Sequence, residues 1–460
     1  MKRDLGLGKD RIGATDEKNY QYANKLAEMI NCKTVFSNDG VYTKEFDKFY
    51  KVIKNNFPLI SKRAKRITFG SGCFLYLIEG KNATKNIMLM SHHDVVDKTP
   101  GRKTDPFKAT VIDGKMYGRG TVDTKTPLFA ELQAIEELLE ENFEFNGINV
   151  YIGSSNNEEV SGDGMVLVSN YFKEHKIHID TVLDEGGAVV SKMIPGYSGK
   201  SAMIAIHEKG RFMYKCVAKT ESKGHVSLNP SDDSVVLRMS NFIKEVSESK
   251  IFTPHFYPEV IGTFKEHAPY LSFPFNIVFK NFNIFKPMIK NIMKKGVQTK
   301  AMLTTSIKFT ASFAGDKNAL YMEPKTANSV MYLRCVREED INTNFHKINA
   351  IAKKYGIEIS LLSRDYCIPS TDKTYGYKIL KETLNSNYPD VVVAPFLLTA
   401  GTDARRLSDV ATSILRFAPI DLNPEQFASI HNDNEYVHIK TIGECVCFYK
   451  SFIKKYIENL

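Results

Sequence analysis

The sequence lacks the long apolar segments that membrane insertion and secretion require. No segment approaches the roughly 20 apolar residues that span a bilayer, and the best candidate, residues 391–400, is interrupted by Pro395. Residues 1–28 are polar and contain no apolar core of about 7–15 residues, which a signal peptide needs. We therefore expect neither a membrane partner nor export.

Cysteines are few and show no pairing motif. The chain has 7 Cys among 460 residues, an odd number, and no C-x-x-C pair occurs because one residue separates Cys445 from Cys447. Such usage is typical of reduced thiols, which the cytosol maintains. Together with the polar N-terminal segment, it predicts a cytoplasmic protein.

Neither the composition nor the charge points to disorder or to nucleic acid. Hydrophobic residues make up 43% of the chain and charged residues 25%, which is ordinary for a globular protein. The 62 Lys and Arg residues exceed the 53 Asp and Glu residues by 9, but the basic residues are scattered. We expect no nucleic-acid partner, and a nucleic-acid-binding module is kept only as a rival interpretation.

Short motifs of several other enzyme classes are missing. Residues 196–201 read G-Y-S-G-K-S, with two residues between the glycines where a phosphate loop needs four. The patterns H-E-x-x-H and G-x-S-x-G do not occur. These absences exclude a phosphate-loop enzyme, a metalloprotease with paired His ligands on one helix, and a serine hydrolase with a nucleophile elbow.

The hydrophobic pattern predicts an α/β sheet. Tyr20, Ala23, Leu26, Ala27 and Ile30 recur at helical spacing and indicate an amphipathic helix packed on a core. Apolar residues of the same kind predict a helix over residues 128–139. Short apolar runs typical of strands lie at residues 87–90, 148–152, 179–183, 391–393 and 412–417. Strands that alternate with helices favour an α/β architecture.

The hydrophobic pattern changes in the middle of the chain, and this change predicts a second domain inserted into the first. New β-rich segments occur at residues 211–218, 330–336 and 357–362. We expect a catalytic domain formed by residues 1–209 and 367–460, with an inserted domain at residues 210–366. Within the insert, residues 273–300 mix aromatics with lysines. A lid helix with a solvated lysine face is favoured there over contact with membrane or nucleic acid.

Metal-ligand residue types follow several predicted strands. In an open α/β sheet, the carboxyl ends of the strands and their loops form the ligand-binding edge. His and carboxylate side chains gathered at such an edge are a ligand set that zinc accepts. The clusters are residues 91–94, 118–125, 156–159, 183–187 and 430–431.

The residues suggest distinct roles within these clusters. His92 and Asp94 share one face of an extended segment, so Asp94 can accept the second ring proton of His92. Asp123 precedes a helix and can bridge two cations or serve as an N-cap. Of the adjacent pair Glu158 and Glu159, one can bind metal while the other takes a proton from water.

The remaining two clusters are weaker when they are taken alone. The Asp184-Glu185 pair is compatible with a metal ligand at either position, or with a simple acidic turn before two glycines. His431 lies in a predicted loop and carries no signal of its own. His431 is a candidate ligand only because the other clusters also contain ligand-type residues.

Taken in order, the clusters resemble the two-zinc exopeptidases that include glutamate carboxypeptidase, aminoacylase and vacuolar carboxypeptidase S. The likeness spans nearly the whole chain and is closest to the branch of carboxypeptidase S and Gly-X carboxypeptidases. Its motifs are His92-x-Asp94, Asp105-Pro106-Phe107, Asp113-Gly114, Tyr117-Gly118-Arg119-Gly120-x-x-Asp123-x-Lys125, Glu158-Glu159, Leu183-Asp184-Glu185-Gly186, Gly224-His225, Asn328, Gly401-Thr402-Asp403-Ala404-Arg405 and His431.

The resemblance implies a fold and a set of metal ligands. The expected fold is a catalytic domain with a mixed sheet and helices on both faces, plus a smaller inserted α+β domain for lid movement and dimerisation. His92 and Glu185 would hold one Zn²⁺, and Glu159 and His431 the other. Asp123 would bridge the two ions, with Co²⁺ or Mn²⁺ as alternatives to zinc.

The resemblance also assigns catalysis and substrate binding. Glu158 would be the general base, Asp94 the partner of His92, and His225 an oxyanion-stabilising residue that reaches the site of a second subunit in a homodimer. Asn328 and Arg405 resemble substrate-binding positions. Relatives of this branch cleave dipeptides or N-acyl amino acids, so we expect hydrolysis that releases the C-terminal amino acid.

Three positions depart from the family pattern. No Trp precedes Pro106, and the chain has no Trp at all; Thr126 stands where Gly is usual, and Val226 where Ser is usual. Every expected metal ligand is nevertheless present. The alternatives are an aminopeptidase or tripeptidase of the same family, and a metal-binding protein on this fold that lost catalysis.

Overall fold

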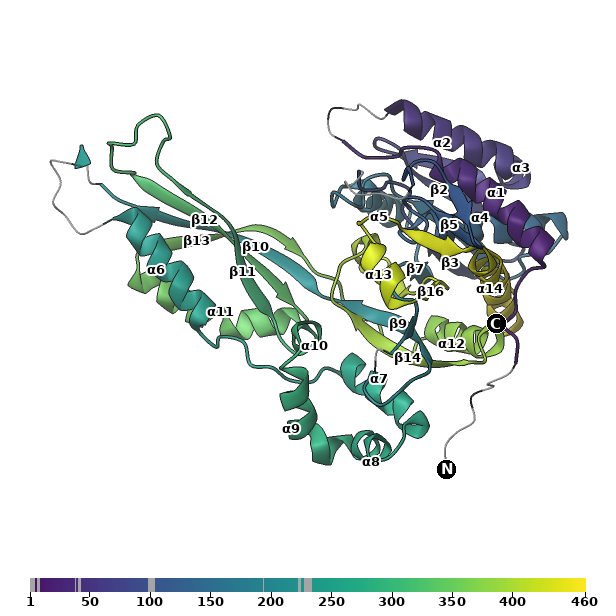
Figure 1. Cartoon of the computed structure of the whole chain (residues 1–460). Helices are drawn as coiled ribbons and strands as arrows, with labels where there is room; N and C mark the ends of the chain where they lie inside the picture. The colour runs from purple at the N-terminus through teal and green to yellow at the C-terminus, as the bar shows by residue number, and fades with distance from the viewer. Residues whose placement is uncertain are drawn as a thin grey trace.

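A computed structural model describes residues 5, 9–37, 39, 43–97, 104–192, 194–221, 225–226 and 234–460. The chain forms a layered α/β body from which a second, elongated β-sheet unit projects (Figure 1). This second unit lies within residues 210–366, which we call the inserted segment.

A mixed 10-stranded sheet forms the centre of the α/β body. Its parallel neighbours β6, β3, β7 and β15 lie in the middle, and β2 pairs antiparallel with β6. In spatial order the strands are β1 (Lys65–Phe69), β2 (Cys73–Ile78), β6 (Ile148–Ser154), β3 (Lys85–Met90), β7 (Ile179–Asp184), β15 (Ala411–Arg416), β9 (Lys200–Glu208), β8 (Val189–Ser191) and β16 (Asp421–Leu422), with β14 (Val391–Leu398) beside β9.

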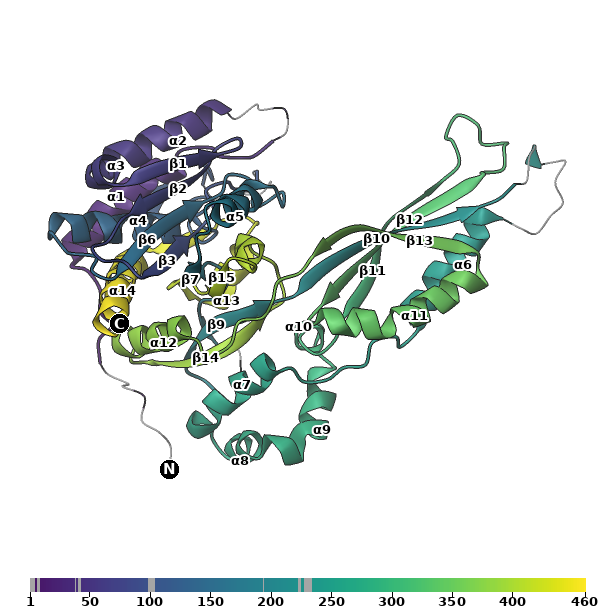
Figure 2. The same ribbon diagram turned by 180° about the vertical axis from the view of Figure 1, so that it is seen from behind.

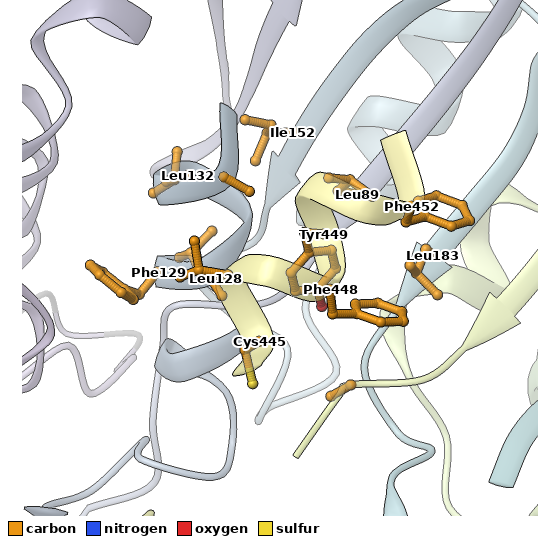
Figure 3. Packing of buried hydrophobic residues seen from close by; sticks show 14 of the residues in the cluster. Leu89, Leu128, Phe129, Leu132, Ile152, Leu183, Cys445, Phe448, Tyr449 and Phe452 are labelled. Carbon is orange, nitrogen blue, oxygen red and sulfur yellow. The ribbon is translucent and has the colours of Figure 1, made fainter. Parts of the chain in front are cut away.

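Helices cover both faces of this sheet. Alternate side chains of β3 divide between two cores, since Ile87 and Leu89 join one cluster and Met88 and Met90 the other. In the first core, side chains of two central helices pack against the strands (Figure 3). The helices of the α/β body are α1 (Asp16–Ile30), α2 (Thr43–Asn56), α3 (Pro58–Arg63), α4 (Lys125–Glu140), α5 (Gly164–Glu174), α12 (Tyr375–Asn387), η3 (Asp403–Leu407), α13 (Pro424–Ser429) and α14 (Ile439–Glu458).

These elements confirm the α/β fold with helices on both faces of a mixed sheet. All five strands predicted for this body and both predicted helices are present. One detail of the first helix was wrong: Tyr20 is exposed, and Tyr22 and Met29 are buried instead. Ala23, Leu26 and Ile30 are buried as predicted, so the helix presents the predicted face with Tyr22 and Met29 added to it. A small antiparallel sheet adds β4 (Thr110–Ile112), β5 (Lys115–Tyr117) and β17 (Tyr436–His438).

The inserted segment contains a four-stranded antiparallel sheet. Its strands lie in the order β11 (Ser306–Ala314), β12 (Thr326–Cys335), β10 (Gly210–Lys219) and β13 (Ile357–Asp365), and α6 (Val235–Glu248) and α11 (Glu338–Lys354) pack on one face. β9 ends at Glu208 and β10 begins at Gly210, so the chain passes from one sheet to the other within two residues. A Cβ atom added at Gly210 would lie 2.6 Å from the ring of Tyr366, so the two crossing points of the chain touch. Independence of this segment as a domain stays a prediction.

A third group of helices belongs to the inserted segment in sequence but packs on the α/β body. It comprises α7 (Pro258–His267), η2 (Ala268–Tyr270), α8 (Phe275–Lys280), α9 (Phe282–Met293) and α10 (Val297–Ala301). α7 lies against β14, and the hydroxyl of Thr263 donates to the carbonyl of Pro395 at 2.6 Å. Seen from behind, α8 and α9 form the lower rim of the molecule, below β14 (Figure 2).

Candidate metal centre and active site

Three adjacent parallel strands bring the predicted ligands together. β3 lies between β6 and β7, with Met90 opposite Gly153 and Leu89 opposite Leu183. Because parallel strands end at the same edge, the loops that follow them meet there. His92 follows β3, Glu158 and Glu159 follow β6, and Glu185 follows β7.

Asp123 stands between two histidines. Its Oδ1 is 3.0 Å from His92 Nε2, and its Oδ2 is 2.9 Å from His431 Nε2. His431 Nε2 is also 3.1 Å from Glu159 Oε2. Ligand atoms of His92, Asp123 and Glu159 all lie within 4.8 Å of one another. We call these three residues and His431 the metal cluster. One carboxylate therefore offers an oxygen to each of two imidazoles, as a bridging ligand would.

Close packing of imidazoles and carboxylates shifts the pKa values within this cluster. Although burial alone would raise it, the pKa of Asp123 is held well below its usual range by His431 and His92. Hydrogen bonds to Asp123 and Glu159 raise the pKa of His431 to about 10. Two imidazoles and two carboxylates at hydrogen-bond distance form a mixed N/O donor set of the kind that divalent cations bind. Glu159 Oε1 is buried and has no hydrogen-bond partner among the described residues. The residues therefore fit metal ions.

Asp94 organises the loop that carries the two glutamates. Its Oδ1 and Oδ2 accept the backbone N–H groups of Glu158 at 3.1 Å and of Glu159 at 3.0 Å. His92 Nδ1 is 2.9 Å from the carbonyl of Asp94 and 3.4 Å from its Oδ1. Both acceptors fix the ring so that Nε2 faces Asp123. The carboxylate of Asp94 thus positions the glutamates as well as the histidine.

Glu158 has the environment of a proton acceptor. Burial raises its pKa to about 8, and the negative charges of Asp403, Asp94 and Asp123 act in the same direction against the opposing charge of His92. Without neighbouring cations, this carboxylate holds its proton more tightly than a free glutamate does. A base of raised pKa beside an amide substrate is suited to general acid–base work.

Asp184, the last residue of β7, and Glu185, which follows it, have different neighbours. Asp184 accepts the backbone N–H of Ala404 at 3.1 Å, on the side of the buried Arg416. Burial, Asp123 and Asp184 raise the pKa of Glu185. Asp123 is thus a main electrostatic neighbour of Glu185, whereas Asp403 and Arg416 are those of Asp184. This contrast favours Glu185 over Asp184 as the ligand, which stays a proposal.

Sequence reasoning missed Glu435, which shapes the turn around Asp123. Its Oε1 accepts the backbone N–H groups of Gly120, Val122 and Asp123 at 3.1, 2.7 and 3.1 Å, and its Oε2 lies 2.8 Å from Arg119 Nη1. Glu435 is buried and 312 residues away from Asp123 in sequence. The only signal available was its place four residues after His431.

Replacing Glu435 with Ala is expected to lower the free energy of unfolding by about 3 kcal/mol or more. The change leaves the buried Arg119 without its partner and three backbone donors without their acceptor. Urea denaturation of the metal-free protein measures the effect. Glu458→Ala, at an exposed position at the end of α14, is the matched control. Equal stability of the two variants would show that Glu435 does not hold the turn.

Three predicted residues lie away from this cluster or are engaged elsewhere. His225 is in the inserted segment, bridged to Met322, and its ring stacks on Tyr321 at 5.5 Å; its neighbour Gly224 lies outside the described residues. Asn328 is half-buried on β12, opposite Val217 and Phe313. The structure does not bring either residue to the metal cluster of the same chain.

Arg405 belongs to a buried ion network. Its Nε is 2.8 Å from Asp365 Oδ2, and its Nη1 donates to the carbonyl of Thr402 at 2.6 Å. Asp365 also receives Arg211 and Arg406, at 3.1 and 2.7 Å. This network ties the inserted segment to the α/β body. Recognition of a substrate carboxylate by Arg405 stays a prediction.

Comparison with known families decides the classification. The family model described as peptidase family M20/M25/M40 matches residues 88–455, most of the chain, and includes every residue of the metal cluster. The chain belongs to this peptidase family. It is therefore a hydrolytic enzyme of a metal-dependent family, which agrees with the resemblance seen in the sequence motifs.

Individual M20 relatives agree with this assignment. The human N-fatty-acyl-amino acid synthase/hydrolase PM20D1 is 28% identical over 98% of this chain and 90% of its own length. A probable carboxypeptidase S-like protein from Dictyostelium discoideum is 27% identical over 97% of this chain and 88% of its own length. The crystal structure of the M20 metallo-carboxypeptidase Sso-CP2 from Sulfolobus solfataricus has a TM-score of 0.66 at 19% identity, covering 96% of this chain and 99% of that one.

The fold of this M20 member thus matches that of a solved metallo-carboxypeptidase. In the part of the chain that the structure describes, no helix is both long and apolar enough to cross a bilayer.

Proposed function

We propose that the protein is a two-zinc amide hydrolase that releases the C-terminal amino acid from dipeptides or N-acyl amino acids. The observation that carries the proposal is Asp123, whose two oxygens each contact a different histidine. The activities after which the PM20D1 and carboxypeptidase S-like relatives are named support the substrate class.

The proposed metal ligands are the four residues of the metal cluster together with Glu185. His92 and Glu185 would hold one ion, Glu159 and His431 the other, and Asp123 both. Bound zinc would supply Lewis acidity to the scissile carbonyl and to the attacking water. Co²⁺ or Mn²⁺ fits the same mixed N/O donors, because affinity alone does not select among such ions.

We propose that Glu158 transfers the proton that the hydrolysis requires. Glu158 takes a proton from the attacking water and gives it to the departing amine nitrogen as the amide bond breaks. The two hydrogen bonds from the Glu158 and Glu159 amides to Asp94 hold this loop in place. His225 of a second subunit stabilises the oxyanion, which requires a homodimer formed through the inserted segment. Asn328 and Arg405 are proposed to bind substrate, and a cytoplasmic setting remains part of the proposal.

A substrate panel tests which end of the substrate is attacked. N-acyl amino acids offer a blocked amine and a free carboxylate, whereas dipeptide amides offer a free amine and a blocked carboxylate. Gly-X dipeptides offer both free ends. We expect zinc-dependent release of the C-terminal amino acid from the first and third groups, measured by amino-acid chromatography. Cleavage of dipeptide amides alone would instead establish the aminopeptidase alternative.

A further inference from the structure

The lower rim of the molecule carries an unusual concentration of exposed apolar side chains. Residues 273–297 contain seven of the 24 large hydrophobic residues that are exposed among those described. We call them the rim residues: Phe273, Phe275, Ile277, Ile284, Met288, Ile292 and Val297. Phe273 is 77% exposed and Val297 88%. Such clustering is uncommon for a surface that faces only water.

The row on α9 is regular. Ile284, Met288 and Ile292 recur at every fourth residue and are 74%, 43% and 56% exposed. They form one stripe along the helix, since residues four apart lie above one another. The sequence had predicted a solvated lysine face here, and no membrane partner. The structure shows that an aliphatic stripe is exposed as well.

Packing on the opposite side fixes the orientation of this helix. Phe282, Ile289 and Met293 are buried in the cluster that includes α7 and β14. The ring of Phe282 lies 4.9 Å from that of Phe256 and 5.8 Å from that of Phe264. With its inner face anchored in this way, α9 cannot turn the outer stripe inward without losing these contacts. The stripe is thus a fixed feature of the surface.

The charge of the same segment has one sign. Residues 268–305 contain six lysines, at positions 280, 286, 290, 294, 295 and 300, and no Asp, Glu or Arg. Their charge of +6 accounts for two thirds of the net charge of +9 of the whole chain. Lys280 is the last residue of α8, four residues before Ile284, and Lys294 and Lys295 follow the stripe directly. The rim therefore combines exposed apolar side chains with a concentrated positive charge.

We propose that the rim formed by α8, α9 and α10 is a docking surface for an anionic phospholipid bilayer. Shallow insertion of Ile284, Met288 and Ile292 at the interface removes their side chains from water, and the lysines attract acidic headgroups. Short amphipathic helices that lie in the plane of a membrane work by this combination, and none of them needs to span the bilayer.

The charge and the stripe argue against other occupants. A second copy of the chain seated on the same rim would bring two sets of six lysines together, which like-charge repulsion disfavours. Nucleic acid would engage the lysines but leave the aliphatic stripe in water, and the segment offers no arginine for base or phosphate forks. A bilayer satisfies both features at once.

Vesicle flotation with the full-length protein tests the proposal. We expect binding to phosphatidylcholine vesicles that contain about a third phosphatidylserine, weaker binding to pure phosphatidylcholine, and a loss of binding at high salt. The double variant Ile284→Gln/Ile292→Gln is expected to lower the partition coefficient about tenfold or more. The charge variant Lys294→Glu/Lys295→Glu is expected to reduce binding to the anionic vesicles specifically.

Matched controls separate the surface from general effects. Leu361→Gln/Leu362→Gln changes two similarly exposed residues on β13, and Lys353→Glu changes an exposed lysine on α11. Both controls should bind vesicles like the wild type. Circular dichroism of every variant checks the fold.

Two outcomes would overturn the proposal. One is equal partition of the wild type and the Ile284→Gln/Ile292→Gln variant. The other is a change in oligomeric state of that variant, measured by light scattering, without a change in vesicle binding, because it would show that the stripe packs against a second copy. Since flotation requires no substrate, its failure would leave the proposed hydrolysis untouched, and failure of the hydrolysis would leave this surface untouched.

Discussion

Replacing Glu158 with Gln is expected to reduce the rate of amino-acid release by about a thousandfold while leaving the metal content unchanged. The glutamine keeps the shape of the side chain but cannot accept a proton from water at neutral pH. The change leaves the proposed metal ligands of the metal cluster in place: His92, Asp123, Glu159 and His431. The loss should therefore appear in kcat, with little change in KM.

A matched substitution controls for the loss of a carboxylate in general. Glu174→Gln alters an exposed glutamate near the end of α5 and should retain wild-type turnover. Metal analysis of both variants shows whether the site is intact. Near wild-type turnover of a fully metallated Glu158→Gln protein would remove Glu158 from the proposed role of general base.

Asp123→Asn is expected to remove at least one of the two metal ions and to abolish activity. Asp123 contacts both histidines and is the only residue of the described cluster whose two carboxylate oxygens both have such contacts. An amide carries no negative charge and offers a single acceptor oxygen, so it cannot bridge two cations. We expect the zinc content after dialysis to fall from two ions per subunit to about one or none.

A second substitution and an unfolding measurement control for indirect effects of Asp123→Asn. Asp113→Asn changes an exposed aspartate in a turn with positive φ, a conformation that Asn adopts readily. It should keep the full zinc content. Thermal unfolding of the metal-free proteins verifies that Asp123→Asn folds. Two zinc ions retained by a folded Asp123→Asn protein would contradict the bridging role.

The sequence could predict that the candidate ligands gather at one edge of the sheet because most of the signals are local. His92, Glu159 and Glu185 each follow a short apolar strand, and parallel strands place such residues at one edge whatever the rest of the chain does. His431 had no local signal, since it follows a short helix and not a strand of the large sheet. Only its place in the order of family motifs indicated its role, and its contacts with Asp123 and Glu159 agree with that role.

Residues that support the site from a distance escaped prediction. Glu435 and Arg119 are 316 residues apart, and nothing near either one reveals the pairing. The same holds for Arg405 and Asp365, which lie in different parts of the fold and meet where the chain crosses between the sheets. Long-range ion pairs depend on the packed structure, so composition and periodicity do not specify them.

In residues 258–301, the sequence predicts helices but not which face of each helix is exposed. Periodicity indicates helices there, but two rows of α9 are equally apolar, and the sequence cannot say which row faces the protein. Contact with Phe256 and Phe264 selects the row of Phe282, which leaves Ile284 and Ile292 outside. Tertiary packing against β14 thus decides the character of the exposed surface.

We propose that the site around Asp123, with two metal ions bound, would support hydrolysis of the amide bond that joins a C-terminal amino acid to its acyl group. The most direct measurement is a zinc titration of metal-stripped protein, with release of the amino acid from an N-acyl amino acid followed at each addition. We expect no release without metal and a rise in rate that is complete at two zinc ions per subunit. Release from the stripped protein at the wild-type rate, or no release from any dipeptide or N-acyl amino acid when two zinc ions are bound, would contradict this proposal.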